Sequence, residues 1–523
     1  MSAAADTMTG MLLARLVEVS TAVAATRSRL EKRDLIADLL REAASTGGAD
    51  EIDIAASYLS GTLRQRRTGV GWRGLADAPT PAGEPSLTLS EVDSVLEEIS
   101  ALSGSGSASA RKSAVAALFG RMTGPEQDYL RNLITGNVRQ GALDSVMLDA
   151  IATAADLPAK AVRRAAMFSA PTGPIAVAAL MAGEAALEEF SMLVGRPVRP
   201  MLAASAPDVT AGVEKVEGEF AVDTKLDGIR IQVHKHGDEV SVFTRSLEEI
   251  GSRLPEVVAA TRTLEPTDLI LDGEAIALDE TGRPRPFQET ASTTSTKAGA
   301  TGIQPFFFDL LLHEDESLIE APTRERLARL DSSVPESLRV RRLVTSSADD
   351  AQEFFARAVA DGQEGVILKR LDAPYDAGRR GSAWVKVKPR HTLDLVVLAV
   401  EWGSGRRQGW LSNIHLGARD PSTGGFVMLG KTFKGMTDEM LAWQTERFTD
   451  LATSPTDGSS YVVELRPEQV VEIAFDGLQR STRYPGGLAL RFARVLRYRD
   501  DKTADEADTI ETVRELGGVT AVG

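Results

Sequence analysis

The hydrophobic period of the chain changes near residue 219, and this change limits the possible folds more than any other feature. Before it, apolar residues recur at helical spacing, as in "LLARLVEVSTAV" (12–23). Thr88 and Glu91 have the spacing of a capping box at the start of one such segment. After residue 219, "FAVDTKLDGIRIQVHK" and "EVSVFTRS" alternate with period two around a Gly-Asp turn. The sequence therefore predicts a helical first third followed by regions built on strands, which begin with an antiparallel hairpin.

Two further boundaries divide the 523 residues, a length that exceeds what one hydrophobic core normally covers. "GRPVRPMLAASAP" (195–207) is a proline-punctuated connector. From there to "WVKVKPRHT" (384–392), strand-like runs mix with helical segments, which predicts an α+β region. Short strands then dominate, which predicts a small β-barrel. We expect the acidic and then glycine-rich stretch after Arg499 to be a frayed tail.

Composition argues against several classes of protein. The chain has no cysteine, which rules out disulfides and thiolate metal sites and fits a reducing cytoplasm. No apolar run reaches the roughly 18 residues of a membrane span, and the N-terminus lacks the basic start of a secretory signal. The net charge of −16 argues against a wholly basic nucleic-acid binder, although local basic patches can still bind DNA. We therefore expect a cytoplasmic protein without membrane contact.

An ordered series of short motifs carries the candidate chemistry. The first is the pattern Lys-x-Asp-Gly-x-Arg in "KLDGIR", which by itself is explained equally well by an ordinary strand end with a tight turn. Further motifs follow in order and change that balance: "TRSLEEI", "LDGEAIA", "FFFDLL", "EGVILKR" and "WVKVKP". Alternate residues share one face of a strand, so both lysines of "WVKVKP" point to the same side. The candidate residues are Lys225, Arg230, Arg245, Glu274, Phe308, Glu364, Lys386 and Lys388.

A lysine that attacks phosphorus has to be unprotonated, whereas the ordinary lysine pKa is about 10.4. Positive neighbours and partial burial both disfavour the ammonium form and lower the pKa of an amine. Arg230, Lys386 and Lys388 are suitable positive neighbours for Lys225. The sequence thus favours a reactive amine at Lys225 over a lysine that merely extends into water.

The ordered motifs resemble those of the covalent nucleotidyltransferase superfamily, and they are most similar to ATP-dependent DNA ligases of the large eukaryotic, archaeal and actinobacterial type. The resemblance covers nearly the whole chain, from "LSGTLRQRRTGVGW" and "LITGNVRQGALD" to "LRFARVLRYRDDK" (490–502). It implies a multidomain fold: an all-α DNA-binding domain (1–198), an α+β nucleotidyltransferase or adenylation domain (199–391), and an OB-fold β-barrel with a C-terminal tail (392–523).

The resemblance also implies an activity and a role for each candidate residue. Lys225 would take AMP from ATP, the AMP would pass to a 5′-phosphate at a nick, and the adjacent 3′-hydroxyl would then displace it. Glu274 and Glu364 would contact Mg²⁺ (or Mn²⁺) or the ribose, and Phe308 would stack on adenine. Asp223 lies where relatives often carry Glu and is the candidate acceptor for the adenine amine. The remaining ATP-binding candidates are Arg230, Arg245, Lys386, Lys388, Arg491, Arg494 and Lys502.

Nicked duplex DNA is the expected partner, and a single nick requires only one copy of the chain, so we expect a monomer. A nick carries no sequence information, so its recognition should rely on phosphates and groove shape. The candidate DNA contacts are basic residues beside glycines or small residues in the first third: Arg64, Arg66, Arg67, Arg111, Lys112, Arg139, Arg163 and Arg164.

Two alternatives stay open at this point. One is an RNA ligase or a GTP-using capping enzyme, against which the long helical first third argues. Another is a DNA-binding scaffold without catalytic activity, against which the full set of candidate cations and carboxylates argues. NAD-dependent bacterial ligases also use a Lys-Asp-Gly motif, but they carry a four-cysteine zinc module that this chain cannot build.

Overall fold

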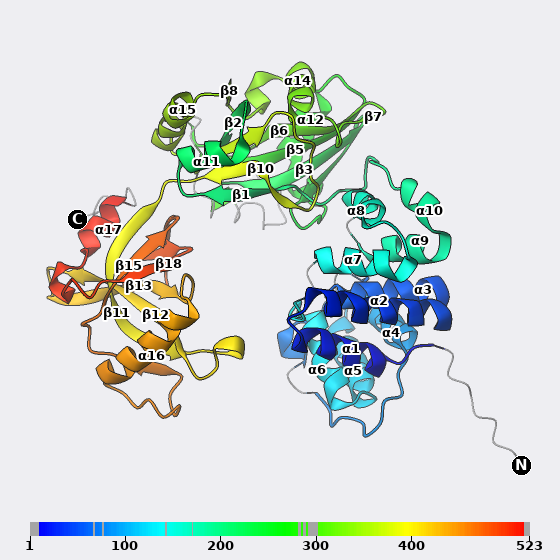
Figure 1. Cartoon of the computed structure of the whole chain (residues 1–523), viewed down its shortest axis with the longest axis horizontal. Helices are drawn as coiled ribbons and strands as arrows, with labels where there is room; N and C mark the ends of the chain where they lie inside the picture. Colours follow the sequence, from blue (N-terminus) through cyan, green and yellow to red (C-terminus); the bar gives the residue numbers. More distant parts are fainter. Residues whose placement is uncertain are drawn as a thin grey trace, which may run out of the picture. The chain divides into compact units, whose positions relative to one another are not determined.

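The computed structural model in Figure 1 describes residues 10–65, 68–75, 78–141, 144–169, 171–280, 284–285, 289–290 and 302–516. Within these ranges, no helix is long and apolar enough to cross a membrane. The chain forms two compact units. The first comprises residues 1–204, 218–344 and 369–384, and the second comprises residues 205–217, 345–368 and 385–523. The three-domain boundaries expected from the sequence stay a prediction.

The first third of the chain is helical, as its hydrophobic period predicts. The predicted capping box is confirmed: the Glu91 N–H donates to the Thr88 hydroxyl (3.2 Å), and the Thr88 N–H donates to the Glu91 carboxylate (2.9 Å). Leu16, Leu40 and Leu96 come from three helices and are fully buried in one core. The helices are α1 (Leu13–Ala25), α2 (Arg29–Thr46), α3 (Gly48–Leu59), α4 (Leu89–Ala101), α5 (Ser107–Gly120), α6 (Gly124–Ile134), α7 (Asp144–Ala155), α8 (Ala159–Phe168), α9 (Gly173–Ala182) and α10 (Glu184–Glu188).

Two five-stranded sheets form the central region. The first has the order β1-β10-β9-β2-β8 and the second has the order β4-β3-β5-β6-β7. The first sheet comprises β1 (Leu202–Ala206), β2 (Phe220–Lys225), β8 (Arg342–Thr345), β9 (Gly365–Arg370) and β10 (Arg380–Val387). The second comprises β3 (Ile229–His236), β4 (Glu239–Thr244), β5 (Asp268–Ala277), β6 (Ile303–His313) and β7 (Glu316–Ser317). The predicted hairpin is confirmed as β3 and β4, which pair antiparallel with Val233 opposite Val242.

Helices pack beside these sheets, and they are α11 (Val209–Val216), α12 (Pro255–Arg262), α14 (Thr323–Ser333) and α15 (Ala348–Ala360). Both α12 and α14 pack against β6, and Phe307 of β6 is fully buried with apolar residues of these helices. Its neighbour Phe308 points to the opposite face, where its ring lies near Trp384 of the first sheet. This alternation leaves one face of β6 for a core and the other for a site.

The C-terminal region is rich in strands and has its own apolar core. Its main sheet has the order β13-β12-β11-β15-β18, and β14 also pairs with β11. The Val495 N–H of β18 donates to the Lys434 carbonyl just after β13 (2.9 Å), so the two edges of the sheet approach each other. The elements are β11 (His391–Trp402), β12 (Leu411–Asp420), β13 (Gly425–Thr432), α16 (Asp438–Leu451), β14 (Val462–Glu464), β15 (Val470–Phe475), β16 (Gly477–Arg480), β17 (Leu488–Arg491), β18 (Arg494–Tyr498) and α17 (Ile510–Leu516).

The expectation of a frayed tail after Arg499 is wrong for the described residues up to 516. Ile510 and Val513 of α17 lie three positions apart and are buried in the core of the C-terminal region. The Arg419 N–H of β12 donates to the Asp508 carbonyl and fixes the approach to this helix (3.0 Å). This short amphipathic helix was not predicted, because the stretch is acidic overall and few of its residues are apolar. Ile510 and Val513 anchor it in the core.

Candidate active site

Lys225 ends β2, and the turn that follows places it beside β5. Its Nζ lies 3.4 Å from the Leu226 carbonyl oxygen. Gly228 is required in this turn, because a Cβ atom there would lie 2.5 Å from the Ala275 carbonyl oxygen. The Gly228 N–H donates to Oε1 of Glu274 (3.2 Å). The Asp-Gly turn therefore joins the candidate amine to the candidate carboxylate, which the sequence separates by almost fifty positions.

Glu274 titrates close to neutral pH. Burial raises the pKa of its carboxyl to about 7, while Lys225 and Arg230, as well as the Gly228 hydrogen bond, oppose that rise. A carboxyl group in this position changes its charge in the range where an enzyme works. The site thus pairs an amine with a carboxyl group whose protonation is set by its burial.

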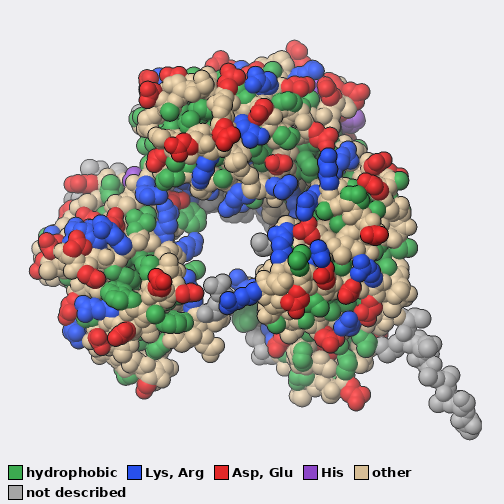
Figure 2. All heavy atoms as spheres, viewed as in Figure 1, with side chains coloured by type: hydrophobic (Ala, Val, Ile, Leu, Met, Phe, Trp, Pro, Cys, Tyr) green, Lys and Arg blue, Asp and Glu red, His purple; other side chains and the backbone are tan. Residues whose placement is uncertain are grey.

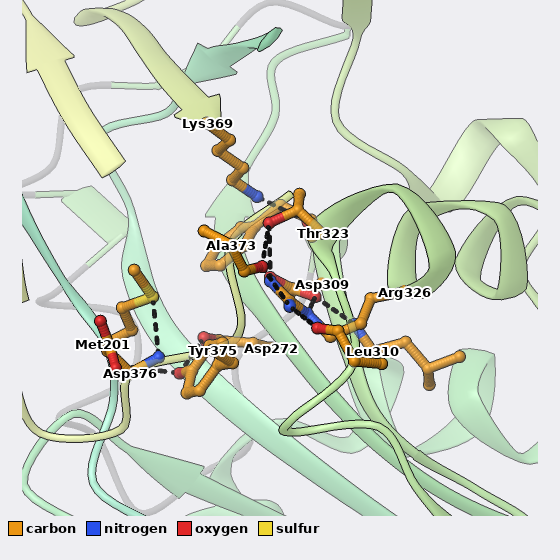
Figure 3. Close-up of polar contacts among 12 residues, drawn as sticks. Met201, Asp272, Asp309, Leu310, Thr323, Arg326, Lys369, Ala373, Tyr375 and Asp376 are labelled. Carbon is orange, nitrogen blue, oxygen red and sulfur yellow. Dashed lines mark hydrogen bonds and ion pairs between the residues drawn. The ribbon is translucent and has the colours of Figure 1, made fainter. Parts of the chain in front are cut away.

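Arg230 is held by the protein rather than presented to solvent. Its guanidinium donates to both oxygens of Asp272 (3.0 and 2.6 Å) and to the Met201 carbonyl (2.6 Å). The Tyr375 hydroxyl donates to Asp272 as well (2.7 Å) and accepts from the Met201 N–H (2.9 Å), a group of contacts partly drawn in Figure 3. Such a bidentate pair fixes the orientation of an arginine. The expected contact of Arg230 with ribose or phosphate stays a prediction.

A buried group of cations and aromatic rings surrounds Asp223, two residues before Lys225. Asp223 faces the interior, where Arg342 donates to one carboxylate oxygen (2.7 Å) and the Lys369 ammonium lies 2.8 Å from the other. Lys369 also donates to the Phe308 carbonyl (2.7 Å), and its Nζ lies 4.8 Å from the Phe308 ring centroid and 4.5 Å from that of Trp384. The indole N–H of Trp384 is buried and has no hydrogen-bond partner among the described residues. The carboxylate expected to accept the adenine amine is therefore already paired with two cations.

A second buried ion pair, between Arg326 and Asp309, anchors β6 to α14. Arg326 of α14 donates to both oxygens of Asp309 (2.8 and 3.1 Å), and both side chains are fully buried. Arg326 also donates to the Ala321 and Ala373 carbonyls (2.7 and 3.2 Å), as Figure 3 shows for Ala373. Because Asp309 directly follows Phe308, this pair fixes the strand that presents the Phe308 ring. Removal of one partner from such a buried ion pair is strongly destabilising, because it leaves the other charge uncompensated.

In the second unit, Lys388 lies just after β10 and is held by two carboxylates. It pairs with Glu364, the residue before β9, and with Asp476 after β15 (3.1 Å). Arg494 also pairs with Asp476 (3.4 Å). Lys386 is partly buried, whereas Val385 and Val387 on the other face of β10 are fully buried, which agrees with the predicted alternation. Asp476 was not among the residues predicted from the sequence, because no local motif marks it.

The last motif contributes cations in two places. Lys502 donates to Asp394 (2.6 Å), as does Arg499 (2.9 Å), a residue that the sequence analysis did not select. Arg491 ends β17, and its guanidinium lies 5.7 Å from the ring centroid of Phe492. Phe492 has a backbone φ of 54°, a strained value for a residue with a side chain, and it is 55 % exposed. An exposed aromatic ring between cations suits contact with nucleic acid.

The basic residues expected to contact DNA lie in different surroundings. Arg66 and Arg67 lie outside the described residues. Arg64 is surrounded by Asp50, Asp53 and Asp93 at 2.9 to 3.2 Å, so carboxylates already hold its charge. Arg163 pairs with Asp149, and Arg164 lies over the Phe168 ring.

Lys112 and Arg139 are exposed, while Arg111 donates to the Leu102 carbonyl (2.8 Å). Arg111 and Lys112 line a hollow of about 380 Å³ beside Gly69 and Gly71.

Arg245 follows β4, and other Lys and Arg side chains gather on one face of the central region. Arg245 is exposed at a small hollow next to Arg230 and Thr244. On the face drawn in Figure 2, basic side chains cluster where β1 and β10 lie in Figure 1, and Asp and Glu are frequent near α15. Arg379 and Arg380 at the start of β10 are both exposed. An overall acidic chain therefore carries a locally basic surface.

No group of three or more His, Cys, Asp or Glu residues that could hold a metal ion is found within the described parts of the chain. Glu274 accepts one hydrogen bond there, from Gly228. Mg²⁺ is usually bound by one or two carboxylates together with phosphate oxygens and water. Single carboxylates at Glu274 and Glu364 fit this kind of site better than a metal centre made only of protein ligands.

Models of known families match most of the chain. Residues 200–388 match the ATP dependent DNA ligase domain, residues 407–502 match the ATP dependent DNA ligase C terminal region, and residues 75–152 match the DNA ligase N terminus. Among solved structures, the fold is similar to a chain titled Pmar-Lig_PreS3, with a TM-score of 0.64 and 19% identity over 92% of this chain and 99% of that one. These matches confirm the predicted order of a helical, an α+β and a strand-rich region.

Curated relatives are similar over almost their whole length. A probable DNA ligase of Beutenbergia cavernae is 63% identical over 97% of this chain and 100% of its own. A probable DNA ligase of Kineococcus radiotolerans is 60% identical with the same coverage. Together with the family models, these relatives show that the chain belongs to the family of ATP-dependent DNA ligases.

Proposed function

We propose that this DNA ligase seals 5′-phosphate/3′-hydroxyl nicks in duplex DNA through an adenylate carried on Nζ of Lys225. The observation that carries the proposal is the turn after Lys225, in which the Gly228 N–H donates to Glu274 and Gly228 packs closely on the Ala275 carbonyl of β5. An amine held at the end of a rigid strand is positioned for nucleophilic attack with little loss of entropy.

The reaction consists of three displacements at phosphorus. The Lys225 amine forms a P–N bond with the α-phosphorus of ATP, and pyrophosphate leaves. An oxygen of the DNA 5′-phosphate then attacks the same phosphorus, which forms a phosphoanhydride and frees the lysine. Finally the 3′-hydroxyl oxygen attacks the 5′-phosphorus of the DNA, a phosphodiester bond forms, and AMP leaves. Such steps depend on positioning and on neutralising the phosphate oxygens.

Attack on the α-phosphorus requires the free amine of Lys225 and neutralisation of the phosphate charge. A divalent cation, Mg²⁺ or Mn²⁺, bound by a carboxylate such as that of Glu274 together with phosphate oxygens would supply charge neutralisation at the reacting phosphates, and Glu364 is the second candidate for a metal or ribose contact. Lys386, Lys388, Arg491, Arg494 and Lys502 are proposed to bind the phosphates of ATP, and Arg245 the ribose or the DNA 5′-phosphate.

The adenine pocket is proposed at Phe308. The partly exposed Phe308 ring offers a stacking surface. Asp223 remains the proposed acceptor for the adenine amine, although its ion pairs with Arg342 and Lys369 restrict it. A charged and fixed acceptor favours adenine, which presents an amine, over guanine, which presents a carbonyl at the same position.

Duplex DNA is proposed to contact both the helical region and the strand-rich region. In the helical region, Arg64, Arg111, Lys112, Arg139, Arg163 and Arg164 are the candidate phosphate contacts, with Arg66 and Arg67 predicted from sequence alone. In the strand-rich region, Phe492 and the cations around it are a further candidate. One chain suffices for one nick, so the proposed active form is a monomer.

The test is sealing of a singly nicked duplex, followed on a denaturing gel, with ATP, GTP and NAD⁺ supplied separately together with Mg²⁺. We expect joined product with ATP alone. A nicked duplex lacking the 5′-phosphate is the matched control substrate and should stay unjoined. Joining with GTP alone, or joining of nicked RNA but not of nicked DNA, would contradict the proposal.

A further inference from the structure

Asp476 is a charged residue that contacts the proposed phosphate-binding cations and has no part in the reaction described above. One of its oxygens lies 3.1 Å from Nζ of Lys388, and the other lies 3.4 Å from the Arg494 guanidinium. Its side chain is 24 % exposed and that of Lys388 is 20 % exposed, so water only partly screens the pair. A single carboxylate thus joins a lysine after β10 to an arginine of β18.

The backbone of the strand-rich region delivers this carboxylate to Lys388. Phe475, the residue before Asp476, pairs with His391 in the antiparallel register of β15 and β11. His391 lies three positions after Lys388, so the strand pairing itself brings Asp476 next to that lysine. The Asp476 N–H also donates to the Arg491 carbonyl (3.0 Å), which fixes the start of β16. The contact is therefore a built feature of this fold rather than a chance meeting of long side chains.

The two carboxylates that pair with Lys388 have different proposed roles once a nucleotide binds. Glu364 is a proposed metal or ribose contact and keeps a role beside ATP. Asp476 has no such role, and its charge repels a polyphosphate that approaches Lys388 and Arg494. A phosphate oxygen and the Asp476 carboxylate are both acceptors for the same N–H donors, so they compete for them.

We propose that Asp476 is a positioning residue for the nucleotide step, which holds Lys388 and Arg494 until the polyphosphate of ATP displaces it. This inference rests on the proposed binding of ATP phosphates by these two cations. In this arrangement Asp476 sets the affinity for ATP rather than the rate of the chemical step.

The variant that tests the inference is Asp476→Asn, which removes the charge and keeps the shape. Binding of an ATP analogue with a methylene group between its α- and β-phosphates is measured by calorimetry in the presence of Mg²⁺, because this analogue cannot transfer AMP. We expect its Kd to fall about two- to fivefold, the range for losing a competing ion pair of this exposure. The KM for ATP in formation of the protein adduct should fall by a similar factor, while the rate at saturating ATP stays within about twofold.

Three further variants separate this role from a merely structural one. Asp476→Glu keeps the charge and should keep the Kd of the full-length wild type. Glu472→Gln is the matched control, because Glu472 lies on the same strand β15 and pairs with Arg497 (2.6 Å) without contacting Lys388. It should leave the Kd unchanged. Asp476→Ser is the second charge-removing variant, with the same expected decrease in Kd, should Asp476→Asn fail to fold.

The outcomes distinguish this inference from the proposed function. An unchanged or higher Kd in folded Asp476→Asn, with normal binding by the wild type, would overturn the role of Asp476 and leave the ligase mechanism intact. A wild-type protein that binds the analogue but never forms an adduct with ATP would instead overturn the mechanism at Lys225. An equal fall in Kd for Glu472→Gln would reduce the effect to general surface charge and would also overturn the inference.

Discussion

At the scale of single residues, burial and Lys225 act on the Glu274 carboxyl in opposite directions. Burial raises the pKa of this carboxyl and is the larger effect, whereas the charge of Lys225 lowers it. Burial keeps the pKa of Glu274 near 7, so its charge is only partly present at neutral pH. The ionised form of Glu274 destabilises the fold, because burial disfavours its charge.

Replacing Glu274 by Gln should stabilise the fold at alkaline pH. The pKa of Glu274 is about 7 in the folded chain, above its ordinary value of 4.5. The protonated carboxyl therefore contributes stability that is fully present below about pH 4.5 and lost as the pH rises through 7. We expect Glu274→Gln to raise the midpoint of thermal unfolding by about 3–6 °C at pH 8 and to have little effect near pH 5.

The measurement is thermal unfolding of both proteins from pH 5 to pH 8. Glu239→Gln is the control, because Glu239 is exposed at the β3–β4 turn. A difference in midpoint that does not grow with pH would show that burial does not govern the charge of Glu274.

At the scale of secondary structure, the site depends on one turn and one strand. The turn between β2 and β3 places Lys225 beside β5, and β6 presents Phe308 while Asp309 anchors it. Neither element has room to adjust, since Gly228 packs on the Ala275 carbonyl and Asp309 is fully buried.

Replacing Gly228 by Ala should impair catalysis more than folding. The new Cβ atom would lie 2.5 Å from the Ala275 carbonyl oxygen and would push the turn away from β5. We expect the rate of adduct formation to fall at least tenfold, since a displacement of about 1 Å can cost a hundredfold, together with a loss of about 1–3 kcal/mol in unfolding free energy. Gly237→Ala is the control, because Gly237 has a positive φ but open space around it. Comparable loss of adduct in both variants would contradict this account.

Replacing Asp309 by Asn should strongly destabilise the chain. It leaves the buried Arg326 without a charged partner, which typically costs about 3–5 kcal/mol. Denaturant unfolding measures the loss. Joint replacement by Asp309→Leu and Arg326→Met should be less destabilising than Asp309→Asn alone, because no charge then remains buried. A double variant less stable than the single one would argue that the pair itself contributes net stability.

The sequence predicted elements better than it predicted the side chains that meet between them. The change of hydrophobic period, the capping box at Thr88 and the β3–β4 hairpin were predictable, because each depends on neighbours in the chain. The pairing of Asp223 with Arg342 joins residues more than a hundred positions apart, and Asp476 reaches Lys388 only through the register of β11 and β15. Such contacts follow from tertiary packing, which a single sequence does not reveal. The positive φ of Phe492 likewise could not be predicted, because the residues around it in the sequence carry no signal for this conformation.

At the scale of the whole molecule, a chain with a net charge of −16 acts on a polyanion. Its acidic residues neutralise several of the basic ones directly, as the three aspartates around Arg64 do. Lys112 and Arg139 remain exposed and are therefore proposed to contact the DNA phosphates. This local use of charge reconciles the acidic composition with membership of a DNA ligase family.

Neutralising Lys112 and Arg139 should weaken DNA binding and change its dependence on salt. Each lost phosphate contact lowers the slope of log Kd against log salt by about one. We therefore expect the variant Lys112→Gln/Arg139→Gln to reduce the slope by about two for nicked duplex. Arg33→Gln is the control, since Arg33 already pairs with the adjacent Asp34. A slope equal to that of the wild type would remove both residues from the DNA surface.

The central claim is that Lys225 carries the adenylate, and mass spectrometry tests it most directly. After incubation with ATP and Mg²⁺, the intact protein should gain the mass of one adenylyl group, and peptide mapping should place that group on Lys225. The variant Lys225→Arg, which keeps the charge, should gain nothing, and nicked duplex should discharge the wild-type adduct. No gain in mass for the folded wild type, or an adenylyl group found on Lys369 or Lys388 instead, would contradict the account.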